Sequence, residues 1–197
     1  MMIQQSIPTK GATIHWAGWY DKVLNILALG RTDKFREMII ALAPLSAGQT
    51  VLDVGCGTGH LTAMAQRVVG SSGKVVGIDA AAEMIAAAQT AYPDVDFQLV
   101  AVEKIPFPDH TFDVALSSLV LHHLPNELKQ TAMAEVLRVL KPGGIFFSVD
   151  FTAGGHLNRG NNMRILESMM HSAGYADVIS SKTDFRTISS LSGRKPY

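Results

Sequence analysis

The stretch VLDVGCGTGH, residues 51–60, decides the fold class of this chain of 197 residues. A short apolar run ends in Asp53 and is followed by three glycines spaced by one residue each, Gly55, Gly57 and Gly59. A run of this kind bounded by glycines is typical of a buried strand, and glycine adopts backbone conformations that other residues rarely reach. The stretch therefore predicts a strand that ends in a tight turn, with a helix after the turn.

Downstream of this turn, strand patterns alternate with helix patterns through short connections. We expect strands at 50–54, 74–78, 95–100, 112–118 and 144–150. Helices are expected after the first, second, fourth and fifth strands, because apolar residues recur there at three- and four-residue steps. Two short segments near 176–182 and 185–192 are rich in Val, Ile and Thr and would close the chain as a hairpin.

This order of elements predicts the fold class. Alternating strands and helices indicate a parallel sheet that is covered on both faces. We therefore expect an α/β fold with a Rossmann-like, doubly wound, mostly parallel seven-stranded sheet, helices on both faces and a C-terminal antiparallel strand hairpin.

Composition and charge argue against several classes of function. Lys and Arg together number 17, as do Asp and Glu, so no net field attracts nucleic acid, and no nucleic-acid partner is expected. Cys56 is the single cysteine, which excludes an intrachain disulfide and a thiolate-cluster metal site, and we expect no metal. No stretch approaches the roughly 18 apolar residues of a membrane span, and the N-terminus lacks a secretory pattern, so we expect a cytoplasmic protein.

The spacing of the glycines and of two acids limits which ligand the turn can hold. The dinucleotide fingerprint is G-x-G-x-x-G, whereas here the position of its third glycine is occupied by His60. The carboxylate of Asp53 would repel a pyrophosphate and tolerate a cation. Asp79, at the tip of the second strand, can accept two hydrogen bonds from a ribose diol, although it can alternatively cap the next helix. These features favour a nucleoside that carries a small zwitterion.

Four motifs in order carry a family resemblance: VLDVGCGTG at 51–59, VVGIDAAAEMI at 75–85, VEKIPFPDHTFDVALSSLVLHHL at 102–124 and EVLRVLKPGGIFFSVDF at 135–151. With them the chain resembles the class I S-adenosylmethionine-dependent methyltransferases. Within that family it is similar to enzymes that methylate small molecules, including quinone C-methyltransferases and phosphatidylethanolamine N-methyltransferases. The resemblance implies S-adenosylmethionine as the cofactor and a small, apolar or amphiphilic methyl acceptor, attacked in line with the departing sulfur.

For the methionine part of the cofactor, the resemblance implies contacts from the turn and from two other segments. They are Asp53, Gly55, Cys56, Gly57 and Gly59 in the turn, the carbonyl of Ser117 at the end of the fourth strand, and Tyr20 near the N-terminus. Asp53 would orient the turn and the amine, and Tyr20 would lie near the carboxylate.

For the adenosine part, Asp79 would hold the ribose hydroxyls, and Ala80 and Met84 would pack against adenine. The segment Ala101-Val102-Glu103 would read the edge of the base. Many relatives have an Asp at the first of these three positions, and that acceptor is absent here. Glu103 can substitute for it, or stacking and backbone contacts alone hold the base.

We expect a single methyltransferase domain over residues 1–197, in which residues 1–44 form a helical lid and residues 45–197 form the cofactor-binding sheet. Aromatic and aliphatic side chains recur at helical spacing between residues 16 and 29 of the lid. That helix can instead pack in the core or contact a membrane surface, but its polar face lacks the basic stripe of a membrane-surface helix.

His122 and His123 follow the fourth strand, close to where an acceptor would enter. Adjacent residues point in different directions, so at most one of them faces the pocket. We expect His122 to act as a general base or substrate contact, and the alternative is that both histidines pack or cap beneath the loop. Two rival functions stay open: a cofactor-binding scaffold without catalysis, and a NAD-dependent dehydrogenase. The sequence decides neither the acceptor nor the oligomeric state.

Overall fold

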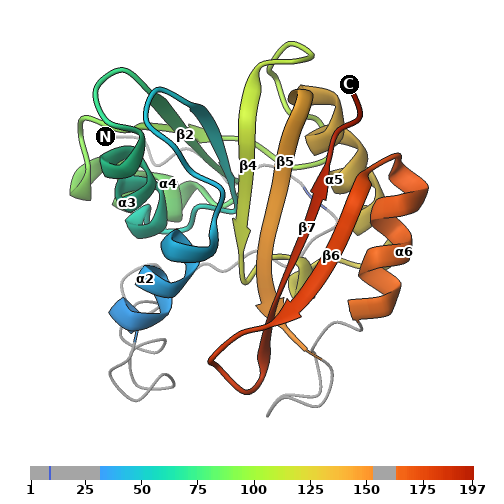
Figure 1. Ribbon diagram of the computed structural model, residues 1–197. Coiled ribbons are helices and arrows are strands. Elements are labelled where there is room, and N and C mark those ends of the chain that lie inside the picture. The colour runs from blue at the N-terminus through green and yellow to red at the C-terminus, as the bar shows by residue number, and fades with distance from the viewer. Residues whose placement is uncertain (1–8, 10–31, 153–162) are drawn as a thin grey trace.

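The computed structural model describes residue 9, residues 32–152 and residues 163–197 (Figure 1). Their elements are, in order, α2 (Thr32–Leu42), β1 (Thr50–Val54), α3 (His60–Val69), β2 (Lys74–Asp79), α4 (Ala82–Ala91), β3 (Asp96–Leu99), β4 (Phe112–Ser118), the short 3₁₀ helix η1 (Leu121–His123), α5 (Asn126–Val139), β5 (Leu140–Phe151), α6 (Met163–Ala173), β6 (Ala176–Lys182) and β7 (Ile188–Arg194). The alternation expected from residue 50 onward is confirmed. The helix expected at 16–29, and Tyr20 with it, lies outside the described residues.

The seven strands form one sheet in the order β3-β2-β1-β4-β5-β7-β6. The first five strands are parallel, and β7 lies antiparallel between β5 and β6. This confirms the predicted sheet and its C-terminal hairpin. The strand order reverses between β1 and β4, and in open sheets of this kind ligands bind beyond the carboxyl ends of the strands at that point.

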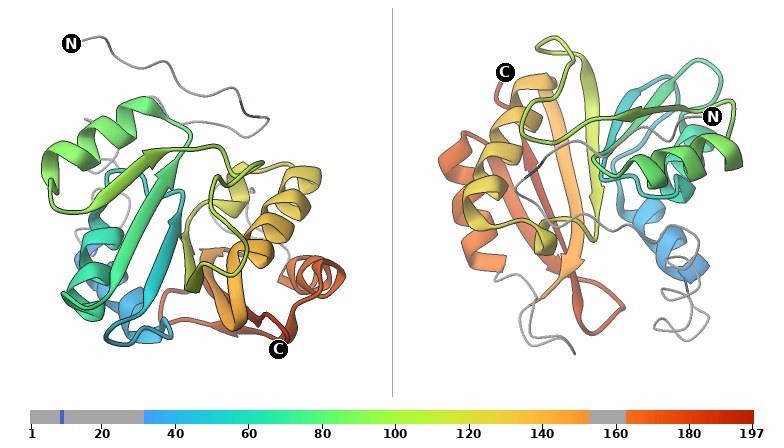
Figure 2. Two further views of the ribbon diagram at one scale, coloured as in Figure 1. Left: turned by 90° about the horizontal axis from the view of Figure 1, so that it is seen from above. Right: turned by 180° about the vertical axis from the view of Figure 1, so that it is seen from behind.

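Two helix layers enclose the sheet, as Figure 2 shows from above and from behind. Neighbouring residues of β1 face opposite layers: Val51 packs in the cluster formed with α2 and α3, and Leu52 packs in the cluster formed with α5 and α6. The side chain of Ile39 in α2 is only 1% exposed, so α2 belongs to the first layer. Helix α4 packs on β2 and β3. Burial on both faces explains why the strands read as unbroken apolar runs.

Strand β5 begins at Leu140, directly after α5 and earlier than the start expected at residue 144. The sequence Lys141-Pro142-Gly143-Gly144 was expected only to end the helix. In the structure Leu140 pairs with Phe112 of β4, and the register shifts before Val114 pairs with Ile145. Gly143 has a φ of +78°, which takes up the irregularity at small conformational cost.

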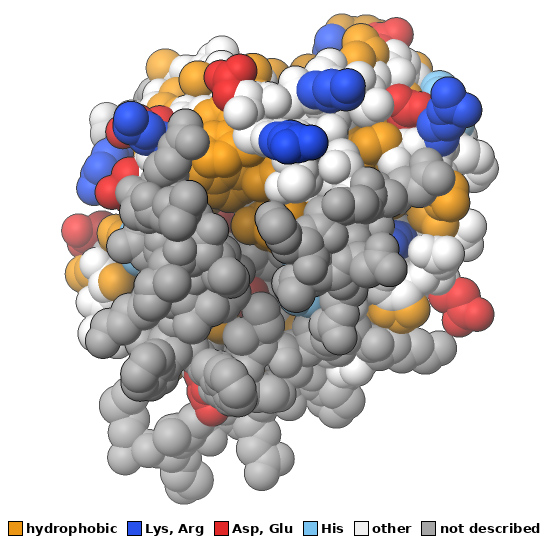
Figure 3. Space-filling model, turned by 90° about the horizontal axis from the view of Figure 1, so that it is seen from below, with side chains coloured by type: hydrophobic (Ala, Val, Ile, Leu, Met, Phe, Trp, Pro, Cys, Tyr) orange, Lys and Arg blue, Asp and Glu red, His pale blue; other side chains and the backbone are white. Residues whose placement is uncertain are grey.

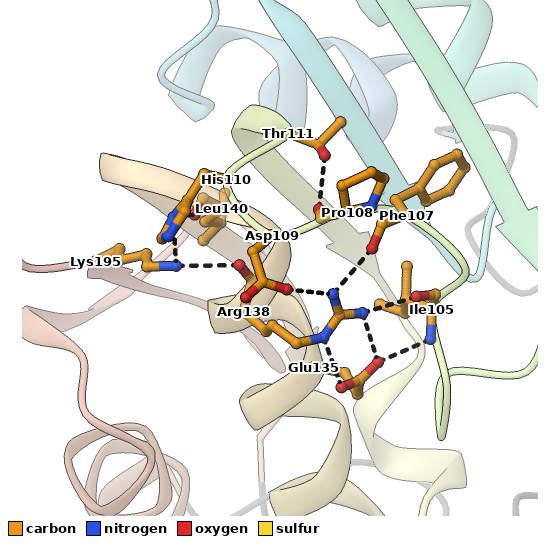
Figure 4. A network of polar contacts seen from close by, with 10 residues as sticks. All are labelled: Ile105, Phe107, Pro108, Asp109, His110, Thr111, Glu135, Arg138, Leu140 and Lys195. Atoms are coloured by element: carbon orange, nitrogen blue, oxygen red, sulfur yellow. Dashed lines mark hydrogen bonds and ion pairs between the residues drawn. The ribbon is translucent and has the colours of Figure 1, made fainter.

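The connection between β3 and β4 runs through residues 100–111 and is fastened to α5 by Arg138 (Figure 4). The guanidinium donates to the carbonyls of Ile105 (2.7 Å) and Phe107 (2.9 Å). Glu135 binds Arg138 and also accepts from the backbone N–H of Ile105 at 2.9 Å. The segment that was expected to read adenine, 101–103, therefore leads directly into an anchored loop.

We expect Arg138→Met to lower the free energy of unfolding by about 1–3 kcal/mol, because the backbone carbonyls of Ile105 and Phe107 and the carboxylate of Glu135 lose a charged donor. Urea unfolding followed by circular dichroism would measure the loss. Asp109→Ala is the matched control: Asp109 also binds Arg138, at 2.8 Å, but its side chain is 62% exposed, so no measurable change is expected. Equal stability of the Arg138 variant and the parent chain would contradict the anchoring role.

Candidate functional site

The candidate site lies at the carboxyl ends of β1, β2, β4 and β5, at the lower edge of the sheet in Figure 1. Figure 3 views the molecule from this side, where acidic and histidine side chains are visible together with hydrophobic surface. The segments that leave these strands carry most of the residues expected at the site. They are the glycine turn after β1, Asp79 and Ala80 at the end of β2, and η1 after β4.

Three glycines of the turn have positive φ, but each serves a different purpose. Gly55 (φ +73°) lies against the side chain of Val120, which a Cβ atom at Gly55 would overlap. A Cβ atom at Gly59 (φ +82°) would lie 2.5 Å from the ring of Phe97, so this glycine lets α3 pack closely. At Gly57 (φ +54°) a Cβ atom would meet no atom of the described residues within 4 Å. The space beside Gly57 is therefore where a ligand can approach the backbone.

Hydrogen bonds to β2 hold the turn in place. The backbone N–H groups of Gly55 and Cys56 both donate to the carbonyl of Ile78, at 2.8 and 3.0 Å. Cys56 is buried, and burial raises the pKa of its thiol well above the ordinary value. A thiol in that state is a poor nucleophile, so the part of Cys56 that can serve a ligand is its backbone.

Asp53 is a carboxylate buried beneath the turn, with its residue only 1% exposed. The hydroxyl of Thr62 donates to its Oδ2 at 2.6 Å. The pKa of Asp53 is raised from 3.8 to about 6. Burial is the main cause and the charge of Asp79 adds to it, whereas the hydrogen bond from Thr62 acts in the opposite direction. An ionised Asp53 is thus costly until a positive charge lies nearby.

Asp79 ends β2 and bridges the turn to the next helix. Its Oδ2 accepts from the N–H of Gly57 at 3.0 Å, and its Oδ1 accepts from the N–H of Ala81 at 2.9 Å. Burial raises the pKa of this carboxyl, and the backbone hydrogen bonds oppose the shift. The backbone N–H of Ala80 also interacts with this carboxylate. A carboxylate has about four acceptor positions, so at least one stays available for a ribose hydroxyl. Asp79 thus holds the segment just before α4, but the N-cap of that helix is Ala81 and has no side-chain cap hydrogen bond, so the alternative role of Asp79 as a helix cap is not borne out.

The residues expected around adenine lie at the ends of β2 and β3. Met84 is 3% exposed, whereas Ala80, Ala101, Val102 and Glu103 are half-buried. Oε1 of Glu103 accepts a hydrogen bond from the hydroxyl of Thr9 at 2.5 Å. The carboxylate that we considered as a substitute acceptor for adenine is therefore engaged by the N-terminal part of the chain.

Ser117 lies at the junction of three strands. It pairs in register with Val54 of β1 and with Ser148 of β5. The hydroxyls of Ser117 and Ser148 are buried, and neither has a hydrogen-bond partner in the described part of the chain. This places two buried polar groups side by side on one face of the sheet, next to the end of the first strand.

His122 is paired with Asp150, a residue that the sequence reasoning missed. Nδ1 of His122 lies 2.7 Å from Oδ1 of Asp150, and the backbone N–H of His122 donates to Oδ2 at 3.1 Å. The side chain of Asp150 is 2% exposed and that of His122 is 10% exposed. The signal was present in the sequence: Asp150 is an acid inside the apolar run that ends the fifth strand.

Two observations on the described ranges concern membrane-spanning helices and clusters of metal-ligating side chains. Over residues 32–152 and 163–197, no helix is both long and apolar enough to cross a membrane. The same ranges contain no cluster of three or more His, Cys, Asp or Glu side chains that could hold a metal ion.

Comparisons with known proteins agree with this geometry. A family model described as "Methyltransferase domain" matches residues 51–144. A ubiquinone/menaquinone biosynthesis C-methyltransferase from Stutzerimonas stutzeri is 34% identical over 142 residues, which are 69% of this chain and 55% of that protein. The chain thus spans only a little over half the length of this relative.

Solved structures share the fold at lower identity. An S-adenosylmethionine-dependent methyltransferase from Aquifex aeolicus superposes with a TM-score of 0.71 at 23% identity, over 81% of this chain and 89% of that one. The [4+2]-cyclase SpnF superposes with a TM-score of 0.72 at 22% identity, over 83% of this chain and 81% of that one. At this identity the similarity is evidence for the fold alone.

The raised pKa of Asp53 leads to a prediction on stability. Since that pKa is about 6 in the folded chain and 3.8 ordinarily, the contribution of Asp53 to stability is fully present below 3.8 and is lost as the pH rises through about 6. Without ligand, Asp53→Asn should therefore be more stable than the parent at pH 7.5, by roughly 1–3 kcal/mol, and no more stable at pH 4. Urea unfolding at the two pH values measures both differences.

The control for this variant is Thr62→Val, which keeps the charge of Asp53 and removes its hydroxyl donor. It should be less stable than the parent at pH 7.5, and the difference should shrink at pH 4. If Asp53→Asn were also destabilised at pH 7.5, the carboxylate would be a net stabilising group and the argument from burial would be wrong.

Proposed function

We propose that this chain, which carries a class I S-adenosylmethionine-dependent methyltransferase domain resembling that of quinone C-methyltransferases, transfers the methyl group of S-adenosylmethionine to a small, apolar or amphiphilic acceptor. One observation carries the proposal: the buried carboxylate of Asp53 and the half-buried carboxylate of Asp79 flank a glycine turn, and no described residue fills the space beside Gly57. A ligand with a positive charge and a ribose diol satisfies both acids, whereas a pyrophosphate satisfies neither.

The residues present fit this cofactor. A cation beside Asp53 lowers the cost of ionising a carboxyl whose pKa burial has raised to about 6. Asp79 keeps at least one acceptor position for a ribose hydroxyl, while its others hold the turn and the segment before α4. The backbone at Gly57 offers close approach to the methionine part. When bound, S-adenosylmethionine supplies an electrophilic methyl group on a sulfonium.

We place the acceptor-binding region beyond the ends of β4 and β5, where Val120 separates it from the glycine turn. His122 belongs to this region, and the apolar cluster beneath α5 and α6 borders it. The chain's own contribution to the rate would be to exclude water and to align the acceptor, and alignment alone provides up to about 7–11 kcal/mol in favourable cases. We still propose that residues 1–44 form a lid, although helix α2 within this range packs on the sheet.

Two rivals remain for the proposed function. A scaffold would bind the cofactor and release no product with any acceptor. A NAD-dependent dehydrogenase would prefer the dinucleotide, against the spacing of the glycines and the position of Asp53. The fold does not decide between chemistries, since the architecture that this chain shares with a methyltransferase is also shared with a [4+2]-cyclase.

The experiment is calorimetry of the full chain with S-adenosylhomocysteine and with NAD, followed by a methyl-release screen over quinols, phenols, thiols, amines and phospholipids. We expect binding of S-adenosylhomocysteine only, and methyl transfer to at least one small acceptor. Tighter binding of NAD would overturn the cofactor assignment. Cofactor binding with no transfer to any acceptor would instead favour the scaffold.

Asp79→Ala tests the ribose assignment. Two charge-assisted hydrogen bonds of about 1.5–3 kcal/mol each are lost, with partial compensation by water, so a net loss of roughly 2–5 kcal/mol is expected. The affinity for S-adenosylhomocysteine should fall by roughly 30-fold to several thousandfold. The melting midpoint without ligand reports separately on the bonds to Gly57 and Ala81. A destabilised variant with normal affinity would leave Asp79 with a structural role only.

A further inference from the structure

We infer that Asp150 is a positioning residue for His122: it holds the proton on Nδ1 of His122, so that Nε2 carries the lone pair that removes a proton from a hydroxyl of the acceptor. This inference rests on the proposed function and deepens it, because it names the group that the acceptor must present. Asp150 and His122 are 28 residues apart in the sequence and come together only in the folded sheet.

Two backbone N–H groups and one ring nitrogen converge on the carboxylate of Asp150. They are the backbone N–H of His122 at 3.1 Å, Nδ1 of His122 at 2.7 Å and the backbone N–H of Phe151 at 2.7 Å. An ionised carboxylate can only accept hydrogen bonds, so Nδ1 of His122 must be the donor in its pair. The neutral imidazole then has its proton on Nδ1 and a free lone pair on Nε2.

The ring of His122 is held in one orientation from two more sides. The ring of His123 lies tilted over it with 3.9 Å between the centroids, and the ring of Phe151 meets it edge-on at 5.1 Å. No residue of the described ranges forms a hydrogen bond with Nε2 of His122. A backbone contact alone would hold the loop after β4, so the additional bond to Nδ1 acts on the ring itself and fixes its tautomer.

The pair lies next to the cofactor side of the site. It joins the ends of β4 and β5, and Val120, two residues before His122, packs directly on Gly55 of the turn. Ser148 precedes Asp150 by two residues, so both side chains are on the same face of β5. Its buried hydroxyl and that of its register partner Ser117 extend the polar strip below Asp150. A polar group of the acceptor that reaches these two serines would lie close to His122, the proposed base.

Within the part of the chain that the structure describes, two titratable side chains interact with the pair. His123 stacks on His122, and Lys129 of α5 interacts electrostatically with Asp150. Burial lowers the pKa of Lys129, and the charge of Asp150 opposes that shift. Asp150 thus balances a nearby ammonium and also stabilises the imidazolium that forms when His122 takes up a proton.

The proton transfer is balanced without any further reactant. The O–H bond of the acceptor breaks, a bond forms between its proton and Nε2 of His122, and the electron pair stays on the acceptor oxygen, which becomes the nucleophile. Nδ1 keeps its own proton throughout, and Asp150 takes up none. The imidazolium afterwards releases the proton from Nε2 to water.

The first test is spectroscopic and needs no acceptor. In long-range ¹H–¹⁵N correlation spectra of the full chain with bound S-adenosylhomocysteine, His122 should be the Nδ1–H tautomer near pH 7.5. Asp150→Ala removes the acceptor that holds this proton, and a free neutral imidazole favours the proton on Nε2, so this variant should show the Nε2–H tautomer. His123→Gln is the control and should leave the tautomer of His122 unchanged. The same tautomer in Asp150→Ala and in the parent would overturn the inference.

The second test is kinetic and uses a hydroxyl acceptor and a thiol acceptor from the methyl-release screen. For the hydroxyl compound, Asp150→Asn and His122→Gln should each lower kcat by about 10²–10⁴-fold, with an unchanged dissociation constant for S-adenosylhomocysteine. The loss should shrink as the pH approaches the pKa of the acceptor, where no base is needed. The thiol acceptor reacts as a thiolate and needs no base, so both variants should methylate it at the rate of the parent chain.

The double variant separates a shared role from two independent ones. If the residues act as a unit, Asp150→Asn combined with His122→Gln should be no slower than His122→Gln alone. Turnover of hydroxyl acceptors that Asp150→Asn leaves unchanged, or a screen that yields only amine and thiol acceptors, would overturn the inference while the proposed function stands. Failure to bind S-adenosylhomocysteine would instead overturn the proposed function.

Discussion

Everything at the site depends on hydrogen bonds that tie the glycine turn to the second strand. Ile78 accepts from two N–H groups of the turn, and Asp79 accepts from a third, so the end of β1 cannot move independently of β2. This constraint fixes the backbone at positive φ and leaves the space beside Gly57 free of other described residues. It also places the charge of Asp79 close enough to raise the pKa of Asp53. The protein holds two acids in an arrangement that is unfavourable until a cation arrives.

The opposite end of the sheet is stabilised by different means. The long connection from β3 to β4 has no helix of its own, and Arg138 and Glu135 hold its backbone through three hydrogen bonds. Because the segment 101–103 lies at the start of this connection, its position depends on contacts far from the ligand edge. The connection is thus held by polar contacts with α5, while the ligand edge carries a buried carboxyl group, Asp53, whose ionisation lowers stability. Such a division is common where a site is preorganised for a charged ligand.

The features that could be predicted from the sequence are those that depend on residues close together along the chain. The strands, the turn and the acids at strand tips depend on local patterns, so Asp53, the glycines and Asp79 could be named as candidates from the sequence. The pairing of His122 with Asp150 depends on two loops that meet only once β4 and β5 lie side by side, so the candidate base could be named but its partner could not. The packing role of Gly59 likewise requires knowing that Phe97 of β3 lies against it. The early start of β5 depends on pairing with β4, which overrides the turn signal of Pro142 and Gly143.

The reversal of strand order divides the site into two halves with different physical tasks. The ends of β1 and β2 provide backbone and carboxylates for a charged ligand, and their glycine and acid pattern is demanding enough to appear in the sequence. The ends of β4 and β5 provide an imidazole, a carboxylate and two buried hydroxyls within an apolar setting. Val120, in the segment after β4, packs on Gly55 and connects the two halves. The acceptor side is therefore the part in which chemistry can diverge on a shared fold, and the tautomer of His122 is the feature by which this chain would select a hydroxyl.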